Sequence, residues 1–215
     1  MDHGKFSSVS LPDRVLAGFS RIAQVLRTNA WREASPRGLT ATQGAILTIL
    51  RREGGCRLAE LASGLGVSMA TASDAVASLV EKGLVKKERQ AGDGRALKLT
   101  LTRQGRKDAG GLTEWPESLA AAVEGLNGAE QRTLLAALMR MVRALQEGGE
   151  IPVARMCTAC CHFRPNVHKD RQQPHHCSYV DAAFGAADLR LECGDFQAAP
   201  AEQAESAWKS VFPII

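Results

Sequence analysis

Apolar residues in the first part of the chain recur every three or four positions, which is the period of a helix with one buried face. The first stripe of this kind consists of Val15, Phe19, Ile22 and Leu26. A second helix is predicted to begin at Thr40, because Gln43 follows three residues later in the pattern of a capping box. The chain therefore opens with two predicted helices that are separated by Pro36 and Gly38.

Two short helices are predicted next, over about residues 57–65 and 68–82, with Gly66 in the tight turn between them. We expect the second of these helices to bury Val76, Leu79 and Val80 on its back. Its opposite face carries Ser68, Ala70, Thr71 and Ser73. In a helix-turn-helix the second helix enters the major groove of DNA, so these four residues are candidate DNA contacts.

After Gly83 the pattern changes to the alternation that is typical of strands. Residues 84–88 and 96–101 are predicted to pair as a β-hairpin around a glycine-bearing loop. From Lys82 to Lys107 the chain has nine Lys or Arg and two Asp or Glu, although the net charge of the whole chain is only +4. The candidate phosphate contacts in the hairpin are Lys86, Lys87, Arg89, Arg95 and Lys98.

A further helix is predicted after Thr102, and the segment 129–147 is strongly amphipathic. The apolar stripe of that segment consists of Leu134, Leu138, Met141, Val142 and Leu145. Gly148-Gly149 and Pro152 then indicate a boundary between a DNA-binding and dimerisation domain, residues 1–150, and a cysteine-rich tail, residues 151–215. The predicted fold class is mainly α with a small β-hairpin (α+β), a winged helix-turn-helix flanked by dimerisation helices, followed by a small metal-stabilised tail.

Five of the six cysteines lie between residues 157 and 193, which favours metal binding over disulfides in a chain without an export signal. Cys157, Cys160, Cys177 and Cys193 are the candidate ligands of an iron–sulfur cluster or a zinc ion. Their uneven spacing suits iron–sulfur, whereas structural zinc usually has two paired knuckles.

Other residues near these cysteines leave alternatives open. Cys161, next to Cys160, is expected to point elsewhere. His175 and His176 are candidate zinc ligands, or residues that support a ligand or face solvent. A tail without metal also remains open, and Cys56 is interpreted as a packed thiol.

Several segments together resemble the multiple-antibiotic-resistance regulator (MarR) family over about residues 11–147. They are Thr40-Ala41-Thr42-Gln43, residues 58–73, residues 83–87, Asp93-Gly94-Arg95 and residues 99–105. The resemblance implies a dimeric winged-helix transcription factor, often a repressor, whose first and last helices pair across a two-fold axis. It also implies that Asp93 orients Arg95. The chain differs from the family in having Gly94, where another Arg is common, and Asp74 in a recognition helix without Arg or Lys before Lys82.

Three hypotheses follow for the function. The first is a regulator that binds a palindromic operator in double-stranded DNA as a homodimer, with an affinity set by a tail site that senses iron or redox state. The second is the same regulator with a structural zinc tail and a small-molecule effector. The third is a thiol-redox enzyme that uses Cys157 and Cys160, although no βαβ pattern surrounds this pair.

The same sequence excludes several other classes of protein. It has no Ser-His-Asp set, P-loop or dinucleotide fingerprint, so we expect no enzyme. No apolar run approaches the ~18 residues of a membrane span, and residues 1–12 lack the apolar core of a signal peptide. We therefore expect a cytoplasmic protein without a membrane partner.

Overall fold

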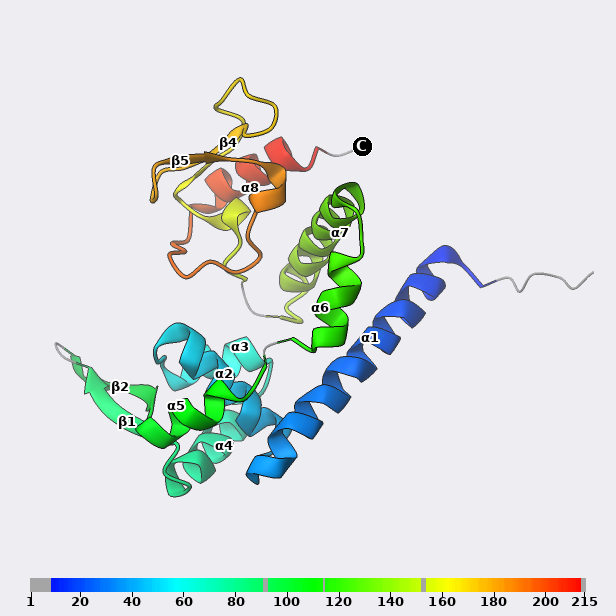
Figure 1. Ribbon diagram of the computed structural model, residues 1–215. Helices are drawn as coiled ribbons and strands as arrows, with labels where there is room; N and C mark the ends of the chain where they lie inside the picture. The colour runs from blue at the N-terminus through cyan, green and yellow to red at the C-terminus, as the bar shows by residue number, and fades with distance from the viewer. Residues whose placement is uncertain (1–8, 91–92, 114, 152–153, 214–215) are drawn as a thin grey trace, which may run out of the picture. The chain divides into compact units, whose positions relative to one another are not determined.

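The computed structural model describes residues 9–90, 93–113, 115–151 and 154–213 (Figure 1). The contacts within the chain divide it into two compact units, Met1–Gly125 and Leu126–Ile215. The pattern of the sequence instead predicted a boundary between residues 1–150 and 151–215, marked by Gly148-Gly149 and Pro152. The structure thus groups the long helix that precedes these glycines with the cysteine-rich segment, and each unit is described by itself below.

The N-terminal unit is mainly helical and carries one hairpin (Figure 1). Its elements are α1 (Leu11–Ala34), a 3-10 turn (Ser35–Arg37), α2 (Ala41–Glu53), α3 (Leu58–Leu65), α4 (Met69–Glu81), β1 (Val85–Gln90), β2 (Asp93–Leu101), α5 (Arg103–Gly110) and α6 (Glu117–Glu124). The hydroxyl of Thr40 accepts from the backbone N–H of Gln43, and the Gln43 side chain bonds back to the Thr40 backbone. The predicted capping box is therefore confirmed, as is the order of helices and hairpin.

The core of the N-terminal unit is almost entirely aliphatic. The largest of its side chains that are at most 1% exposed are Ile46, Leu47 and Leu50 of α2, Leu61 of α3, and Val76 and Leu79 of α4. The prediction that Val80 is buried with them is wrong, since Val80 is 37% exposed. The buried face of α4 is centred on Ala72, Val76 and Leu79, and Val80 lies at the edge of that face.

Close backbone contacts fix the hairpin to the helices. Val85 pairs with Leu101 in the antiparallel ladder, and Cys56 adds a bridge to Leu99 through two backbone hydrogen bonds of 3.1 and 2.8 Å. A Cβ on Gly105 of α5 would lie 1.9 Å from the carbonyl oxygen of Leu84. Only glycine therefore permits α5 to lie this close to the base of the hairpin.

Helix α1 leaves most of its apolar residues exposed. Of its 24 residues only Asn29 and Ala34 are buried. Val15 and Ile22, which belong to the predicted stripe, are 47% and 43% exposed. This stripe is therefore available to another surface.

The C-terminal unit contains more regular structure than its sequence indicated (Figure 1). Its elements are α7 (Gly128–Glu147), a 3-10 turn (Cys157–Ala159), β3 (Phe163–Arg164), β4 (His175–Cys177), β5 (Ala182–Phe184), a second turn (Ala186–Asp188) and α8 (Ala201–Val211). The three strands form an antiparallel sheet in the order β3-β4-β5. Strands of two or three residues are too short to produce a detectable period.

Helix α7 is part of the core of this unit. Met139 is fully buried, and the cluster around it includes Met156 and Phe163. The Arg143 guanidinium lies over the Trp208 ring of α8, 4.4 Å from its centroid. Val142 also packs against this core.

The apolar stripe predicted on α7 is thus split between two faces. Val142 points into the C-terminal unit, while Leu134 and Leu145 are 37% and 44% exposed. The prediction that Val142 shares one stripe with Leu134 and Leu145 was therefore wrong. Within the described ranges, no helix combines the length and apolar character needed to cross a membrane.

Candidate nucleic-acid interface and cysteine-lined cavity

The outer face of α4 is the first candidate site. All four predicted contacts, Ser68, Ala70, Thr71 and Ser73, are exposed. Ser68 is the N-cap of the helix, because its hydroxyl accepts from the Thr71 N–H at 3.1 Å. The Ser68 and Thr71 hydroxyls also bond to each other at 2.9 Å. These two groups therefore shape the helix start, while Ala70 and Ser73 lie on the face opposite the core.

The back of α4 is held in place by a polar contact to α2. The Gln43 amide donates to the Ser78 hydroxyl at 3.1 Å and accepts from the Lys82 ammonium at 3.0 Å. The ammonium of Lys82 also donates to the carbonyl of Gly38 at 2.6 Å. The outward face of α4 is thus presented by a fixed helix.

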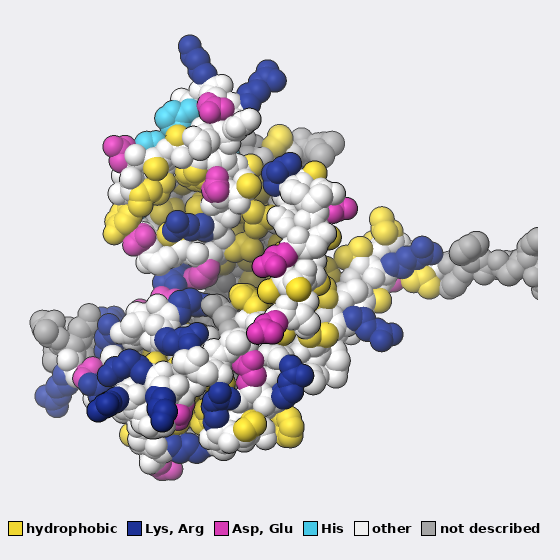
Figure 2. Space-filling model, viewed as in Figure 1, with side chains coloured by type: hydrophobic (Ala, Val, Ile, Leu, Met, Phe, Trp, Pro, Cys, Tyr) yellow, Lys and Arg dark blue, Asp and Glu magenta, His cyan; other side chains and the backbone are white. Residues whose placement is uncertain are grey.

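The predicted cations of the hairpin differ in their surroundings. Figure 2 shows Lys and Arg side chains gathered over the part of the N-terminal unit that carries the hairpin and α5. Lys87 and Arg89 are exposed. Lys86 forms an ion pair with Glu88 at 2.5 Å, and this contact lowers the pKa of the Glu88 carboxyl. Lys86 therefore contributes less positive field than an isolated lysine would.

Of the remaining predicted contacts in the hairpin, only Lys98 has a side chain that the structure describes. Lys98 lies opposite Glu88 in the ladder and is half-buried. The side chains of Asp93 and Arg95 lie outside what the structure describes. The contact between them that the family resemblance implies remains a prediction.

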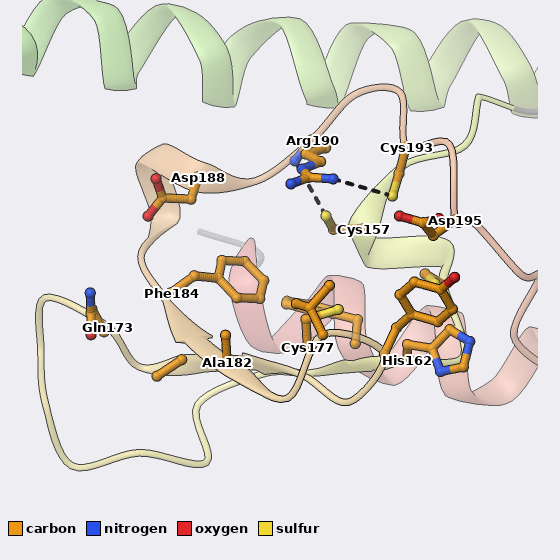
Figure 3. A pocket seen from close by; sticks show the side chains of 15 residues that line it. Cys157, His162, Gln173, Cys177, Ala182, Phe184, Asp188, Arg190, Cys193 and Asp195 are labelled. Atoms are coloured by element: carbon orange, nitrogen blue, oxygen red, sulfur yellow. Dashed lines mark hydrogen bonds between the residues drawn. The ribbon is translucent and has the colours of Figure 1, made fainter. Parts of the chain in front are cut away.

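The second candidate site is a cavity of about 380 Å³ in the C-terminal unit (Figure 3). All four predicted ligands line it: Cys157, Cys160, Cys177 and Cys193. Cys157 lies in the 3-10 turn Cys157–Ala159 and Cys160 directly follows it, whereas Cys177 ends β4 and Cys193 lies in the segment before α8. Segments up to 36 residues apart in sequence thus place their thiols around one cavity. Its other walls include the rings of Phe163, Tyr179 and Phe184.

Arg190 connects two of these thiols, as Figure 3 shows. Its backbone N–H donates to the Cys157 sulfur at 3.3 Å, and its guanidinium donates to the Cys193 sulfur at 3.7 Å. Burial raises the pKa of Cys157, and the Arg190 N–H opposes this shift. The Cys193 sulfur raises the pKa of the Arg190 guanidinium. A positive charge is thus held beside sulfurs that would carry negative charge as metal ligands.

The other residues considered as ligands face elsewhere. The Cys161 thiol donates to the side-chain amide oxygen of Gln197 at 3.8 Å, and Cys161 is not among the residues that line the cavity. His175 is buried between Phe163 and Phe184, accepts from the Asn166 N–H, and has its pKa lowered by burial. His176 instead contacts His168 and Asp181, both at 3.2 Å.

Sequence reasoning missed other residues of the cavity wall, Arg190, Asp195 and His162. His162 stacks against Tyr179, with 5.3 Å between the ring centroids. Its Nε2 is buried and has no hydrogen-bond partner within the described residues. The only sequence signal for His162 was its position after the Cys160-Cys161 pair.

The donor set can be compared with what a metal requires. Four thiolates around one zinc ion lie about 4 Å from one another, given a Zn–S distance of about 2.3 Å. Across the described ranges, no three His, Cys, Asp or Glu side chains are arranged so that they could hold one metal ion. The four thiols line one cavity, but they do not converge on one point as the ligands of a single zinc ion would.

Comparison with known proteins concerns mainly the first site. Residues 39–97 match the MarR family, a segment that runs from the start of α2 into β2. The chain is 26% identical over 145 residues to the uncharacterised HTH-type transcriptional regulator YwhA of Bacillus subtilis (strain 168), covering 66% of this chain and all of that protein.

Solved structures are similar over the same share of the chain. The transcriptional regulator SlyA is 24% identical with a TM-score of 0.55, covering 62% of this chain and 95% of SlyA. The Staphylococcus aureus MepR–DNA complex is 24% identical with a TM-score of 0.52, covering 61% of this chain and 97% of MepR. The likenesses to solved structures show the fold, and in these three comparisons between about a third and two fifths of this chain has no counterpart.

Proposed function

We propose, from the match of residues 39–97 to the MarR family, that the chain is a MarR-type winged-helix, DNA-binding transcriptional regulator. The observation that carries the proposal is α4, which is fixed from behind and exposes its outer face beside a hairpin that bears Lys87 and Arg89. A helix in the major groove and cations along the phosphates are the two contacts that this fold makes with DNA. MepR, which is similar in fold, was crystallised with DNA.

We further propose that the regulator is a homodimer on a palindromic operator. The exposed stripe of α1 and the outer residues of α7, Leu134 and Leu145, are the surfaces that a second copy would cover. Apolar surface of this extent on two long helices favours burial against a partner. Two symmetric copies would place two α4 helices on successive major grooves, and repression would follow where the operator overlaps a promoter.

The cysteine-lined cavity is proposed to hold an iron–sulfur cluster. Four free thiols line one space that is larger than a single ion needs, and the side chains of Phe163 and Phe184 form part of its wall. Arg190 donates to two of these sulfurs, to Cys157 through its backbone N–H and to Cys193 through its guanidinium. A bound cluster would supply sensitivity to iron or oxidants.

Regulation is proposed to pass through α7. One face of this helix, with Met139 and Val142, belongs to the core that also contains Cys160. The other face, with Leu134 and Leu145, belongs to the proposed dimer surface. A rearrangement around the cavity would therefore change the helix that sets the spacing of the two DNA-reading units.

Anaerobic purification followed by DNA binding tests this function. We expect brown protein with broad visible absorption, iron in excess of zinc, and an affinity for a selected duplex that changes when the metal is removed. Colourless protein with one zinc and unchanged DNA affinity after chelation would favour the structural-zinc alternative. Absence of binding to any duplex would contradict the DNA-binding function itself.

The two alternatives differ in how the structure bears on them. A cavity of about 300 Å³ in the N-terminal unit, lined by residues of α1, α2 and α3, favours a small-molecule effector as the second candidate. The thiol-redox enzyme is disfavoured, because burial raises the pKa of Cys157 and a nucleophilic thiol requires a lowered one. A dithiol turnover assay would detect such an activity.

A further inference from the structure

The outward face of α4 has an unusual chemical composition for a helix that reads DNA. The residues opposite its buried side are Ala70, Ser73, Asp74 and Ala77, spaced three, one and three apart, and all are exposed. Met69, which is 51% exposed, and Thr71 flank this row on either side. From Ser68 to Glu81 the sequence has no Arg, Lys, Asn, Gln or His. The face thus offers methyl groups, small hydroxyls and one carboxylate.

Each base exposes a distinct set of groups in the major groove, so this composition restricts what α4 can recognise. Guanine is read by Arg or Lys, and adenine by the amide of Asn or Gln. None of these side chains is present on α4. The remaining pairings are apolar contact with the methyl group of thymine and a carboxylate that accepts from the amino group of cytosine.

The hydroxyl groups at the start of α4 add little to the set of bases that this helix can recognise. The hydroxyls of Ser68 and Thr71 are bonded to each other, and Ser68 also accepts from a backbone N–H. The Thr71 side chain therefore has its methyl group left for contact. Ser73 is the remaining hydroxyl of the first two turns, and serine accepts several bases.

We propose that α4 reads its operator through thymine methyl groups, contacted by Met69, Ala70 and Thr71, and through one cytosine amino group, contacted by Asp74. The inference rests on the proposed DNA-binding function and assigns the chemistry of its half-site. Each half-site contains thymines at the positions that face the start of α4. One C·G pair lies at the position that faces Asp74, one helical turn after Ala70.

The first test changes only the DNA. The full-length protein selects its site from a random duplex pool, and each thymine of the enriched half-site is then replaced singly by uracil, which lacks only the methyl group. We expect roughly fourfold weaker binding at each contacted thymine, the effect of one buried methyl group. Replacement outside the half-site is the control and should change nothing. Replacement by 5-methylcytosine paired with guanine retains the methyl group and should restore part of the loss.

The second test changes Asp74. Asp74→Asn presents an amide that prefers adenine, so selection with this variant should replace the cytosine of the half-site by adenine, with roughly tenfold lower affinity for the original site. Glu124→Gln in α6 removes the same charge elsewhere and should leave the selected site unchanged. The inference is overturned, and the DNA-binding function is not, if an enriched site binds equally well after uracil replacement and Asp74→Asn selects the same sequence. A pool that enriches no duplex would overturn the DNA-binding function together with it.

Discussion

Cys56 in the N-terminal unit and Cys157 in the C-terminal unit are both withdrawn from water, but their neighbours differ. Cys56 packs in an aliphatic core, and its backbone completes the hairpin through Leu99. Cys157 lines a cavity with three other cysteines and accepts from the Arg190 N–H. Burial alone thus produces an inert thiol in one unit, whereas four thiols around one cavity produce a candidate binding site in the other.

The two units also differ in what completes their cores. The N-terminal unit closes around leucine, isoleucine and valine from α2, α3, α4 and the hairpin, with alanines from α1 and α5. The C-terminal unit combines α7 and α8 with short strands and leaves a cavity of about 380 Å³ beside Phe163. We therefore expect the first unit to depend on packing, and the second to depend in addition on what fills its cavity.

The largest expected effect is the loss of metal when a ligand cysteine of the C-terminal unit is replaced, in contrast to a cysteine that is not a ligand. Cys177→Ser should release the bound metal completely, because a four-thiolate site that loses one ligand also loses the convergence of the rest. Cys161→Ser, whose thiol is directed at Gln197, is the matched control and should keep its metal. Metal per chain is measured by elemental analysis.

The same variants test whether α7 belongs to the second unit. After metal loss, hydrogen exchange should increase in α7 together with α8, while α2 to α5 keep their protection. The assignment of ligands fails if Cys161→Ser empties the site or if Cys193→Ser leaves it full. In the latter case a histidine would be the fourth ligand, and zinc would be favoured.

A matched pair of core truncations compares the two cores directly. Leu61→Ala and Met139→Ala each remove a side chain that is fully buried in one unit. Each should lower the free energy of unfolding of its own unit by about 2–5 kcal/mol. Hydrogen exchange resolved by peptide measures both units in one experiment. Equal loss of protection in both units after either change would contradict the division at Gly125.

A smaller effect is expected from glycines at the base of the hairpin. Gly105→Ala would place a methyl group against the Leu84 carbonyl and should destabilise the N-terminal unit by about 1–3 kcal/mol. Gly110→Ala on the same helix has no atom within 4 Å of the new Cβ and should be neutral or slightly stabilising. Thermal unfolding of the two variants distinguishes them, and equal midpoints would contradict the close approach of α5.

The smallest expected effect is the pH dependence of stability that comes from the Cys56 thiol. Burial, with the nearby Glu60 and Glu53, raises the pKa of Cys56 from 9.0 to about 11. The folded chain thus keeps this proton where the unfolded chain releases it, so the stability it contributes is present below pH 9.0 and is lost as the pH rises towards 11. Cys56→Ala should lack this alkaline loss. At pH 8, iodoacetamide should modify Cys56 in native protein much more slowly than in urea, and equal rates would contradict its burial.

Periodic segments of the N-terminal unit were predictable because local rules decided them. The capping box at Thr40 and the αL turn at Gly66 depend on residues within a few positions of each other. Val80 was misplaced because spacing alone does not define how wide the buried face of α4 is. The ion pair of Lys86 with Glu88 joins two residues of β1 that lie on the same face of the strand, and it is absent from the sequence-based predictions.

The C-terminal unit was predictable only where residue type restricted the chemistry. Cysteine spacing identified four residues that line one cavity and one, Cys161, that is directed elsewhere. Arg190 was missed because its contact with Cys157 spans 33 residues and no local pattern marks it. Helix α7 packs one face into the core of the C-terminal unit and leaves apolar residues exposed on another. This was missed because the spacing of Val142 fits an apolar stripe on either face.

The exposed stripe of α1 has a consequence for the abundance of the protein in a cell. If that stripe is covered only when two copies meet, the folded population depends on how many copies are present. Cell growth without new synthesis would dilute the protein, and the proposed dimers would then dissociate. Because single chains would be exposed to proteolysis, the protein concentration would fall faster than dilution alone predicts. A gene under such a regulator would respond sharply to a modest drop in synthesis.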